Sequence, residues 1–421
     1  MKKNVLLILV WIVPALYGQK NFEYYISKAL ENATSLNQLR NQIPINKLQN
    51  ELDKALNSAF QISLTGNYLF APYFNNSNGL ITTNPDPKAI GYDVGITNGG
   101  LYSAQVNIQK NIFNGKLIDV LKNKNELSDK STLNDIKIEE HNLRKIVIDQ
   151  YLSCIQNLWL YNLTKEISAN LNEQLRITGG LVEKGFVKAQ DYLLLKIEYK
   201  NQQMQLNEIW RNYKSGLMQL NSICGLQDTN TVYLENVTLD VMKHIYLSSF
   251  IMKYSIDSLA LQNQQELFET KYQPQVNLFF NTGLNAVELE NIQRKFGLSA
   301  GVNFSLPLFD GNQKALTRQQ NDIYGKTIQQ NRDYIEKNLF LQRQNGYEKI
   351  KSIKTSLDNL QDQIKDYDQV ILLAQKQVEQ GSMMMIEYLT ILKNYIELQK
   401  NKIIAEINYQ LEINNYNYWN W

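Results

Sequence analysis

The sequence contains few of the residues that interrupt regular structure. Its 421 residues include only 7 Pro and 20 Gly, so long helices and strands are favoured over many short turns. Charge of neither sign predominates, because 43 Lys and Arg stand against 41 Asp and Glu. The lysines are also dispersed rather than clustered, so a surface for nucleic acid is not indicated.

Residues that carry catalytic chemistry are also scarce. The two histidines, His141 and His244, have no Cys or carboxylate neighbour at metal-ligand spacing. No Gly-rich phosphate loop that ends in Lys-Ser or Lys-Thr is present. Cys154 and Cys224 are expected to be buried free thiols, since a helical hairpin that turns near Gly185 would offset them by ~12 Å of helix rise, more than a disulfide spans. We therefore predict no enzyme activity, no cofactor and no metal site.

The N-terminus combines a charged start with a short apolar run. Lys2 and Lys3 precede an apolar segment that contains Pro14 and ends at Gly18. This segment is shorter than the ~20 residues that a spanning helix needs, which favours a cleaved signal peptide at residues 1–18 over an N-terminal membrane anchor. No later segment resembles a spanning helix, so membrane insertion would have to use β-strands.

Two different motifs recur at the same distance along the chain. The segment Val182-Glu183-Lys184-Gly185 matches Val378-Glu379-Gln380-Gly381, and Phe113-Asn114-Gly115 matches Phe309-Asp310-Gly311. Both pairs are separated by 196 residues, which indicates an internal duplication. We predict a first structural repeat at 19–225, an inter-repeat linker at 226–247 and a second structural repeat at 248–421.

Each repeat is predicted to contain a long helix and a helix that returns along it. The segment from Gly311 to Gln380 has no Pro, and between Ile350 and Ile371 its apolar residues recur at spacings of three and four, as in a coiled coil. Its counterpart in the first repeat runs from about Gly115 to Thr178. Each long helix is followed by a Gly at a turn that we call an elbow, near 185 and 381. Further helices are expected at 21–58, 186–222, 248–272 and 382–416.

Each repeat also contains a pair of strands with alternating character. Phe296, Leu298 and Phe304 alternate with small or polar residues over a length that suits a membrane strand. We predict β-hairpins at 60–112 and 274–308. Four strands are too few to close a barrel, so several chains would have to contribute. The alternative is a soluble sheet packed on the helices.

Together these elements predict an α+β membrane protein. A long α-helical coiled-coil barrel, which forms a tunnel, would be continuous with a transmembrane β-barrel. Each chain would supply four strands and would contain the internal duplication. An oligomeric barrel continued by such helices has the architecture of a conduit.

The order of these motifs resembles the TolC-type outer membrane efflux protein family across nearly the whole mature chain. The segment Leu306-Pro307-Leu308-Phe309-Asp310-Gly311 is similar to the family's "PLFDGG" junction between strand and helix, and each elbow Gly is followed six residues later by an acid. The resemblance implies a homotrimer in outer membrane lipid that extends into the periplasm. It also implies two partners, a periplasmic adaptor (membrane fusion) protein and an inner membrane pump that is proton-driven or ATP-driven.

The resemblance further implies where the channel closes. Asp191 and Glu387 match the family's acids at the elbow constriction, where each would form a ring of carboxylates; alternatively, each is a solvated acid near a helix N-terminus. Thr390, Met383 and Val378 stand where the best-known members carry polar or charged residues that hold the elbows together. We therefore hypothesise that apolar packing replaces those contacts. Adaptor docking is expected at Gly185, Phe186, Tyr192, Gly381, Met383, Met384 and Tyr388.

The run Met383-Met384-Met385 raises the alternative of copper or silver export, because thioethers bind soft ions. Consecutive helix residues do not face one another, so one chain cannot direct three sulfur atoms at one metal ion.

The predicted function is a passive trimeric channel of a tripartite efflux or type I secretion system, leading from adaptor and pump to the cell exterior. The alternative is a non-conducting structural coiled-coil rod. The sequence does not specify the cargo.

Overall fold

The computed structural model describes residues 21–76, 79–93, 100–243 and 248–421. The predicted signal peptide and His244 lie outside the described residues. The chain divides into two compact units. The helical unit contains the residues up to Leu39, Asp135–Ile251 and Asp333–Trp421, and the sheet unit contains Arg40–Asn134 and Met252–Arg332.

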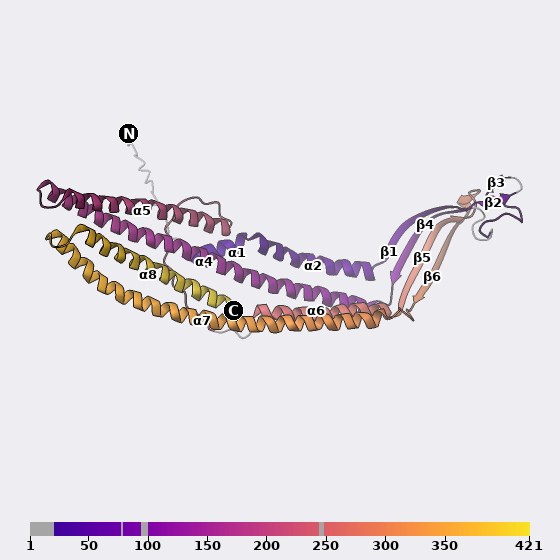
Figure 1. The fold of residues 1–421 in the computed structure, drawn as a ribbon. Helices are drawn as coiled ribbons and strands as arrows, with labels where there is room; N and C mark the ends of the chain where they lie inside the picture. Colours follow the sequence, from indigo (N-terminus) through magenta and orange to yellow (C-terminus); the bar gives the residue numbers. More distant parts are fainter. Residues whose placement is uncertain (1–20, 77–78, 94–99, 244–247) are drawn as a thin grey trace, which may run out of the picture. The chain divides into compact units, whose positions relative to one another are not determined.

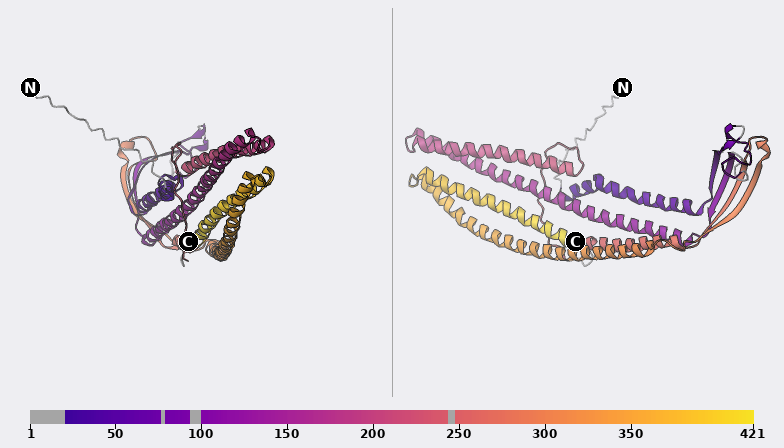
Figure 2. Two further views of the ribbon diagram at one scale, coloured as in Figure 1. Left: turned by 90° about the vertical axis from the view of Figure 1, so that its left-hand side faces the viewer. Right: turned by 45° about the vertical axis from the view of Figure 1, so that its right-hand side comes forward.

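Helices make up most of the chain (Figure 1). The longest are α4 (Gly115–Glu183) and α7 (Gln313–Glu379), with 69 and 67 residues, or ~100 Å each at 1.5 Å per residue. In the helical unit, α5 (Ala189–Ile223) returns beside α4, and α8 (Met385–Trp419) returns beside α7 (Figures 1 and 2). The other helices are α1 (Phe22–Asn32), α2 (Thr34–Ser58), α6 (Ser249–Glu269), and the short 3-10 helices η1 (Thr270–Tyr272) and η2 (Ile292–Arg294). In the described ranges, none of the helices has both the length and the apolar character needed to cross a membrane.

The predicted helices form, with differences at their ends. α4 continues past Thr178 to Glu183, and the ring of Tyr192 lies close to Gly179 on this added stretch; tertiary packing overrides the low helix propensity of Gly. The predicted N-terminal helix is divided at Ala33, whose ψ of 119° is not helical. α5 and α8 begin three residues later than predicted, because the residue before each has an extended backbone.

The sheet unit contains a four-stranded antiparallel sheet in the order β1-β4-β5-β6. Its strands are β1 (Gln61–Phe70), β4 (Gly100–Asn111), β5 (Gln275–Ala286) and β6 (Phe296–Ser305). β1 pairs with β4, and β5 pairs with β6, as predicted. β4 and β5 join the two pairs into one sheet, with Ile108 opposite Phe280. Among the described residues, the edge strands β1 and β6 have no outer partner.

The two faces of this sheet differ in polarity. The register sets Ile62, Ile108, Phe280 and Ala300 in one row across the four strands, whereas the adjacent row on the other face consists of Ser63, Asn107, Asn281 and Ser299. The apolar face is open within the chain, since Leu64 and Leu298, in the next apolar row, are 78% and 75% exposed. The predicted alternation is therefore present in the sheet, with exceptions: Lys110 and Thr282 lie on the apolar face, and Phe279 lies on the polar face opposite Gly301.

The segment between β1 and β4, predicted as a long surface loop, contains structure of its own. β2 (Tyr73–Asn76) and β3 (Gly79–Thr82) form a small antiparallel sheet, and Phe74 forms a β-bridge with Ile90. Tyr73 is only 2% exposed, and a Cβ at Gly91 would lie 2.4 Å from its ring. Close packing of an aromatic ring on Gly thus gives part of this segment a core.

The junctions between strand and helix have equivalent contacts in the two repeats. Asn114, just before α4, donates from its side-chain amide to the carbonyl oxygen of Asn57 near the end of α2. Asp310, at the matching position before α7, accepts from the Tyr272 hydroxyl at 2.5 Å and from the Lys314 amide at 2.8 Å. Asp310 thereby satisfies a first-turn N–H of α7. The repeated motif thus connects each long helix to the helix that precedes its hairpin.

Polar side chains join the helices of the sheet unit. Asn46 on α2 donates to Asp129 on α4 at 2.9 Å, and Asn125 on α4 donates to Asp53 on α2 at 2.8 Å. Apolar residues of α2 point elsewhere and are exposed, at spacings of three and four: Ile45, Leu48, Leu52 and Leu56. This helix therefore has a polar face toward α4 and an uncovered apolar stripe.

The helical unit has two apolar clusters, and the first contacts the segment that follows α5, which was predicted as the inter-repeat linker. Tyr151 and Tyr213 are buried in this cluster, and their hydroxyl groups donate to the linker carbonyl oxygens of Glu235 and Val232 at 2.7 and 2.6 Å. Amide side chains of α8 bind the linker further on, where Gln410 and Asn417 accept from the backbone N–H groups of Leu239 and Met242 at 2.7 and 2.8 Å. These contacts satisfy the backbone of an extended segment.

Cys154 and Cys224 belong to the same cluster and are free thiols, as predicted. Burial raises the pKa of each thiol to about 12.

The second cluster lies next to the elbows. Its buried members are Ile167, Leu171, Leu175, Leu195, Ala374, Met385, Tyr388, Leu389, Leu392 and Ile396.

Candidate channel gate at the two elbows

Both elbows have the same backbone geometry. At the first, Gly185 has a φ of 77°, its N–H donates to the carbonyl oxygen of Val182, and the N–H of Phe186 donates to that of Leu181, each at 2.9 Å. The second elbow repeats these contacts around Gly381, whose φ is 71°. This is the Schellman arrangement that ends a helix, and its positive φ favours Gly.

The helix that follows each elbow begins in the same way. Lys188 before α5 and Met384 before α8 have extended backbones and provide no side-chain cap. Asp191 and Glu387 are the third residues of their helices, and each is the acid of a first turn. A negative charge at this position is favoured by the helix dipole, so local structure alone accounts for an acid at both positions. Their role as carboxylate rings stays a prediction.

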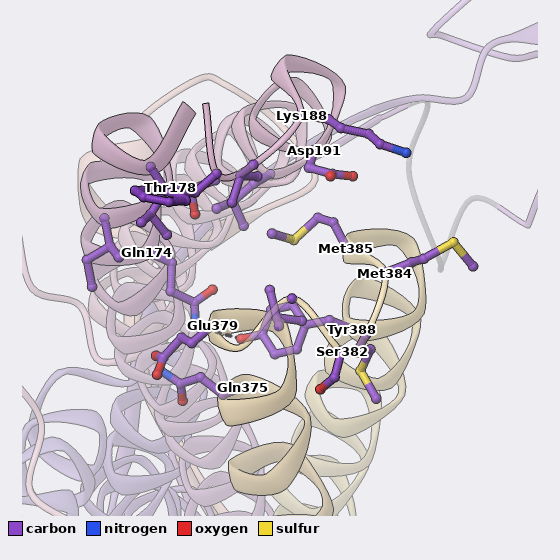
Figure 3. Close-up of a pocket in the computed structure, with 18 residues that line it drawn as sticks. Gln174, Thr178, Lys188, Asp191, Gln375, Glu379, Ser382, Met384, Met385 and Tyr388 are labelled. Atoms are coloured by element: carbon purple, nitrogen blue, oxygen red, sulfur yellow. Dashed lines mark hydrogen bonds between the residues drawn. The ribbon is translucent and has the colours of Figure 1, made fainter. Parts of the chain in front are cut away.

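A cavity of about 300 Å³ lies between the two elbows (Figure 3). It brings together residues of both helical hairpins, and from the predicted site it is lined by Phe186, Asp191, Gly381, Met383, Met384 and Tyr388. Gly185, Tyr192 and Glu387 are not part of its lining. Tyr192 instead packs against the second apolar cluster, and Glu387 is exposed.

Tyr388 connects the two helical hairpins through a contact that sequence analysis missed. Gln174 on α4 donates from Nε2 to the Tyr388 hydroxyl oxygen on α8 at 2.6 Å (Figure 3). Burial raises the pKa of Tyr388, the Gln174 hydrogen bond lowers it, and the charge of Glu379 raises it. Gln174 carries no signal in the sequence, because Gln is common on the exposed faces of these helices.

The three consecutive methionines have different environments. Met385 is buried, Met383 is half-buried against the second cluster, and Met384 is 63% exposed. Figure 3 shows Met384 directed away from Met385. The sulfur atoms of Met384 and Met385 therefore do not converge. Met383 and Met384 precede α8, and the extended backbone at Met384, rather than helix geometry, gives these side chains different directions. Across the described ranges, no group of three or more His, Cys, Asp or Glu residues is arranged to hold a metal ion.

Two of the elbow positions where the sequence has an apolar residue in place of a polar or charged one, Val378 and Met383, make apolar contacts. Val378 and Met383 both pack against the second cluster. Val378 also accepts the hydrogen bond from Gly381 at 3.0 Å. Polar contacts between the hairpins are nevertheless present, at Gln174 and further along α5 and α8.

No family profile and no curated protein sequence matches the chain. Solved structures do match it. The Campylobacter jejuni CmeC outer membrane channel has a TM-score of 0.72 at 17% identity, over 96% of this chain and 86% of that chain. The outer membrane protein VceC from Vibrio cholerae has a TM-score of 0.71 at 11% identity, over 95% and 96%. The open state of the Neisseria gonorrhoeae MtrE outer membrane channel has a TM-score of 0.67 at 11% identity, over 95% and 88%.

These likenesses extend over almost the whole chain, including both repeats and the sheet. The chain therefore has the fold of the TolC-type outer membrane channels, and the resemblance that the sequence indicated is confirmed at the level of the fold.

Proposed function

We propose that this chain forms a homotrimeric outer membrane channel, the passive conduit of a tripartite efflux or type I secretion system. The observation that carries the proposal is the four-stranded sheet, whose apolar face is exposed and whose edge strands are open in the described chain. Such a sheet suits a barrel that several chains assemble in a membrane. In water, the same sheet would leave its edges and its apolar face unprotected.

Apolar surface on the helices of the sheet unit supports association between copies. α2 exposes the apolar stripe that contains Leu48, and α7 exposes Leu316 and Ile323. Large apolar patches are typical of protein interfaces. We therefore propose these faces as contacts between neighbouring subunits of the trimer.

The proposed gate is the elbow region, with Asp191 and Glu387 as its acids. Three copies of each carboxylate around a common axis would attract cations and repel anionic solutes. Phe186 and Met384 are 76% and 63% exposed, which supports this region as the docking surface for a periplasmic adaptor that also binds an inner membrane pump.

The proposed domain organisation follows the duplication. Residues 1–18 form a signal peptide, 19–225 and 248–421 form the two repeats, and 226–247 link them. The four strands would lie in the outer membrane, and the helices that carry the elbows would extend into the periplasm.

Planar-bilayer recording on the purified full-length protein tests the channel role. We expect trimers and a cation-selective conductance whose selectivity falls in the double variant Asp191→Asn with Glu387→Gln. Glu173→Gln serves as the matched control, because this exposed acid pairs with Arg176 on its own helix at 2.6 Å. Trimers that never conduct would instead support the structural rod.

Photo-crosslinking in cells tests the partner proposal separately. A photoreactive residue at Phe186 or at Met384 should capture an adaptor, and the pump found with it would distinguish proton-driven efflux from ATP-driven export. The control position is Leu289, an exposed residue between β5 and β6, where no adaptor should be captured. Failure at both elbow positions would reject the tripartite assignment.

A further inference from the structure

Polar contacts connect the two helical hairpins behind the elbows, between α5 and α8. Lys393 Nζ lies 3.2 Å from Glu198 Oε2, and Lys400 Nζ donates to Gln205 Oε1 at 2.7 Å. The two lysines are seven residues apart on α8, and their partners are seven apart on α5, so each pair of positions repeats on one helix face. We call Glu198, Gln202, Gln205, Lys393 and Lys400 the α5–α8 seam.

Glu198 is the unusual member of this seam, because it is a buried carboxylate. It is 4% exposed, and it accepts a hydrogen bond from Gln202 Nε2 at 3.0 Å in addition to its contact with Lys393. Gln202 is itself 3% exposed, and its Oε1 is buried with no hydrogen-bond partner in the described part of the chain. The lysine of the pair has an exposed side chain.

Burial of these groups has a cost that depends on whether the hairpins are together. When α5 and α8 are in contact, Glu198 loses water and is compensated by Lys393 and Gln202; if they separated, water would compensate it instead. A buried ion pair often gives little net stabilisation, but a buried charge whose partner is removed is strongly destabilising. Lys400 is also half-buried, and burial lowers its pKa. The contact between the hairpins therefore depends on compensation within the seam.

We propose that Glu198 and Lys393 are positioning residues of the gate, and that Lys393 must neutralise Glu198 for the two helical hairpins to stay together. This inference rests on the proposed channel function, since it assumes that the elbow end closes when the hairpins approach. It locates the charged contact of the closed arrangement on the seam rather than at Val378 and Met383, where the sequence has apolar residues.

Paired substitutions test the proposal. Lys393→Met removes the ion-pair partner of buried Glu198. The Gln202 hydrogen bond and the charge of Lys400 remain but compensate the carboxylate only in part, so we expect the hairpins to separate and the open probability of the channel to rise about tenfold. Adding Glu198→Leu removes the charge that must be buried, and the double variant should return to within about twofold of the parent. A variant that merely misfolds would not be restored by this second change.

Lys402→Met is the matched control. Lys402 is also on α8, but its partner Glu406 is on the same helix, at 3.7 Å. This variant should have the same open probability and the same distance between the hairpins as the parent. A rise in open probability equal to that of Lys393→Met would overturn a specific role for the seam.

Two readouts keep this inference separate from the channel proposal. Electron spin resonance on full-length protein, with spin labels at Leu193→Cys on α5 and Ile386→Cys on α8, measures the separation of the hairpins; the native thiols are buried and stay unlabelled. Bilayer recording measures the open probability. A longer distance in Lys393→Met that is reversed in the double variant supports the positioning role. If the distance changes in this way but the conductance does not, Glu198 and Lys393 hold the hairpins together without controlling a gate, and their proposed role in gating is overturned. An unchanged distance overturns the positioning role whatever the conductance.

Discussion

At the scale of single residues, the elbow region is held by side chains whose importance comes from burial. Gln174 and Tyr388 are far apart in the sequence, yet they form one hydrogen bond between α4 and α8. Because Tyr388 is buried, its hydroxyl cannot exchange this partner for water without local opening, which makes the bond a measurable contribution to local stability.

Replacement of Tyr388 by Phe tests that contribution. The change removes the acceptor of Gln174 and should lower the stability of the first turns of α8 by about 1 kcal/mol. We expect amide hydrogen exchange there to become about fivefold faster. Tyr334→Phe, at an exposed position on α7, is the control. Equal exchange rates in parent and Tyr388→Phe would show that the bond does not stabilise the elbow.

The two thiols provide a second prediction at this scale. Burial raises the pKa of Cys154 and of Cys224 to about 12, so near pH 8 both are protonated, and the reactive thiolate is scarce. Iodoacetamide should leave the folded protein unmodified and should label both thiols after denaturation, as mass spectrometry can count. Labelling of one thiol in the folded protein would contradict its burial.

At the scale of elements, each elbow depends on a Gly that ends one helix and allows the next to return. Gly185 and Gly381 have φ of 77° and 71°, a conformation that costs other residues roughly 1 kcal/mol or more. A Cβ at either Gly would meet no atom within 4 Å. The requirement is therefore conformational rather than steric.

Gly185→Ala should accordingly lower the free energy of unfolding by about 1 kcal/mol. Gly180→Ala is a sharp control, because Gly180 lies inside α4 with equally open space around it; there Ala should raise stability by about 0.5–1 kcal/mol through its higher helix propensity. Denaturant titration of both variants measures whether the free energy of unfolding falls or rises. A neutral or stabilising Gly185→Ala would mean that the elbow does not need a positive φ.

The motif before each long helix shows how well local sequence predicts elements. Asn114 and Asp310 were identified only as members of a repeated motif, and the structure gives both a bond to the helix that precedes their hairpin. The start of α7 was predictable within two residues because Gly311 and a polar residue precede it. The partner Tyr272 was not predictable, since the contact spans 38 residues of sequence.

At the scale of the whole molecule, the polarity of the sheet should decide where the protein resides. Leu298 lies on the exposed apolar face, and Ser299 lies beside it on the opposite face. In a membrane barrel, Leu298→Arg would put a charge in lipid at a cost of about 2–4 kcal/mol, whereas Ser299→Arg would face the lumen and be tolerated.

We expect Leu298→Arg to reduce the heat-resistant trimer in outer membrane fractions and Ser299→Arg to leave it at the parent level. Quantitative immunoblotting of fractionated cells measures both. If Ser299→Arg were the more damaging of the two, the faces would be reversed. If neither had an effect, the sheet would not be a membrane sheet.

The sequence determined the local and repeating features of this protein. Pro scarcity and helical periodicity specified α4 and α7, and alternation specified which residues share a face of the sheet. The 196-residue repeat gave both elbows. These features depend on neighbours within a few residues or on identical patterns, so a single sequence is sufficient to reveal them.

Only the tertiary structure decided which of these elements meet. The pairing of β4 with β5, the bond from Gln174 to Tyr388, and the burial of Glu198 beside Lys393 bring together residues from different repeats. Tyr73 is likewise buried against Gly91, in a segment that resembles a loop in sequence. Contacts of this kind depend on packing and on loss of water, which arise when distant segments approach, and the same residue types occur throughout the chain without making them.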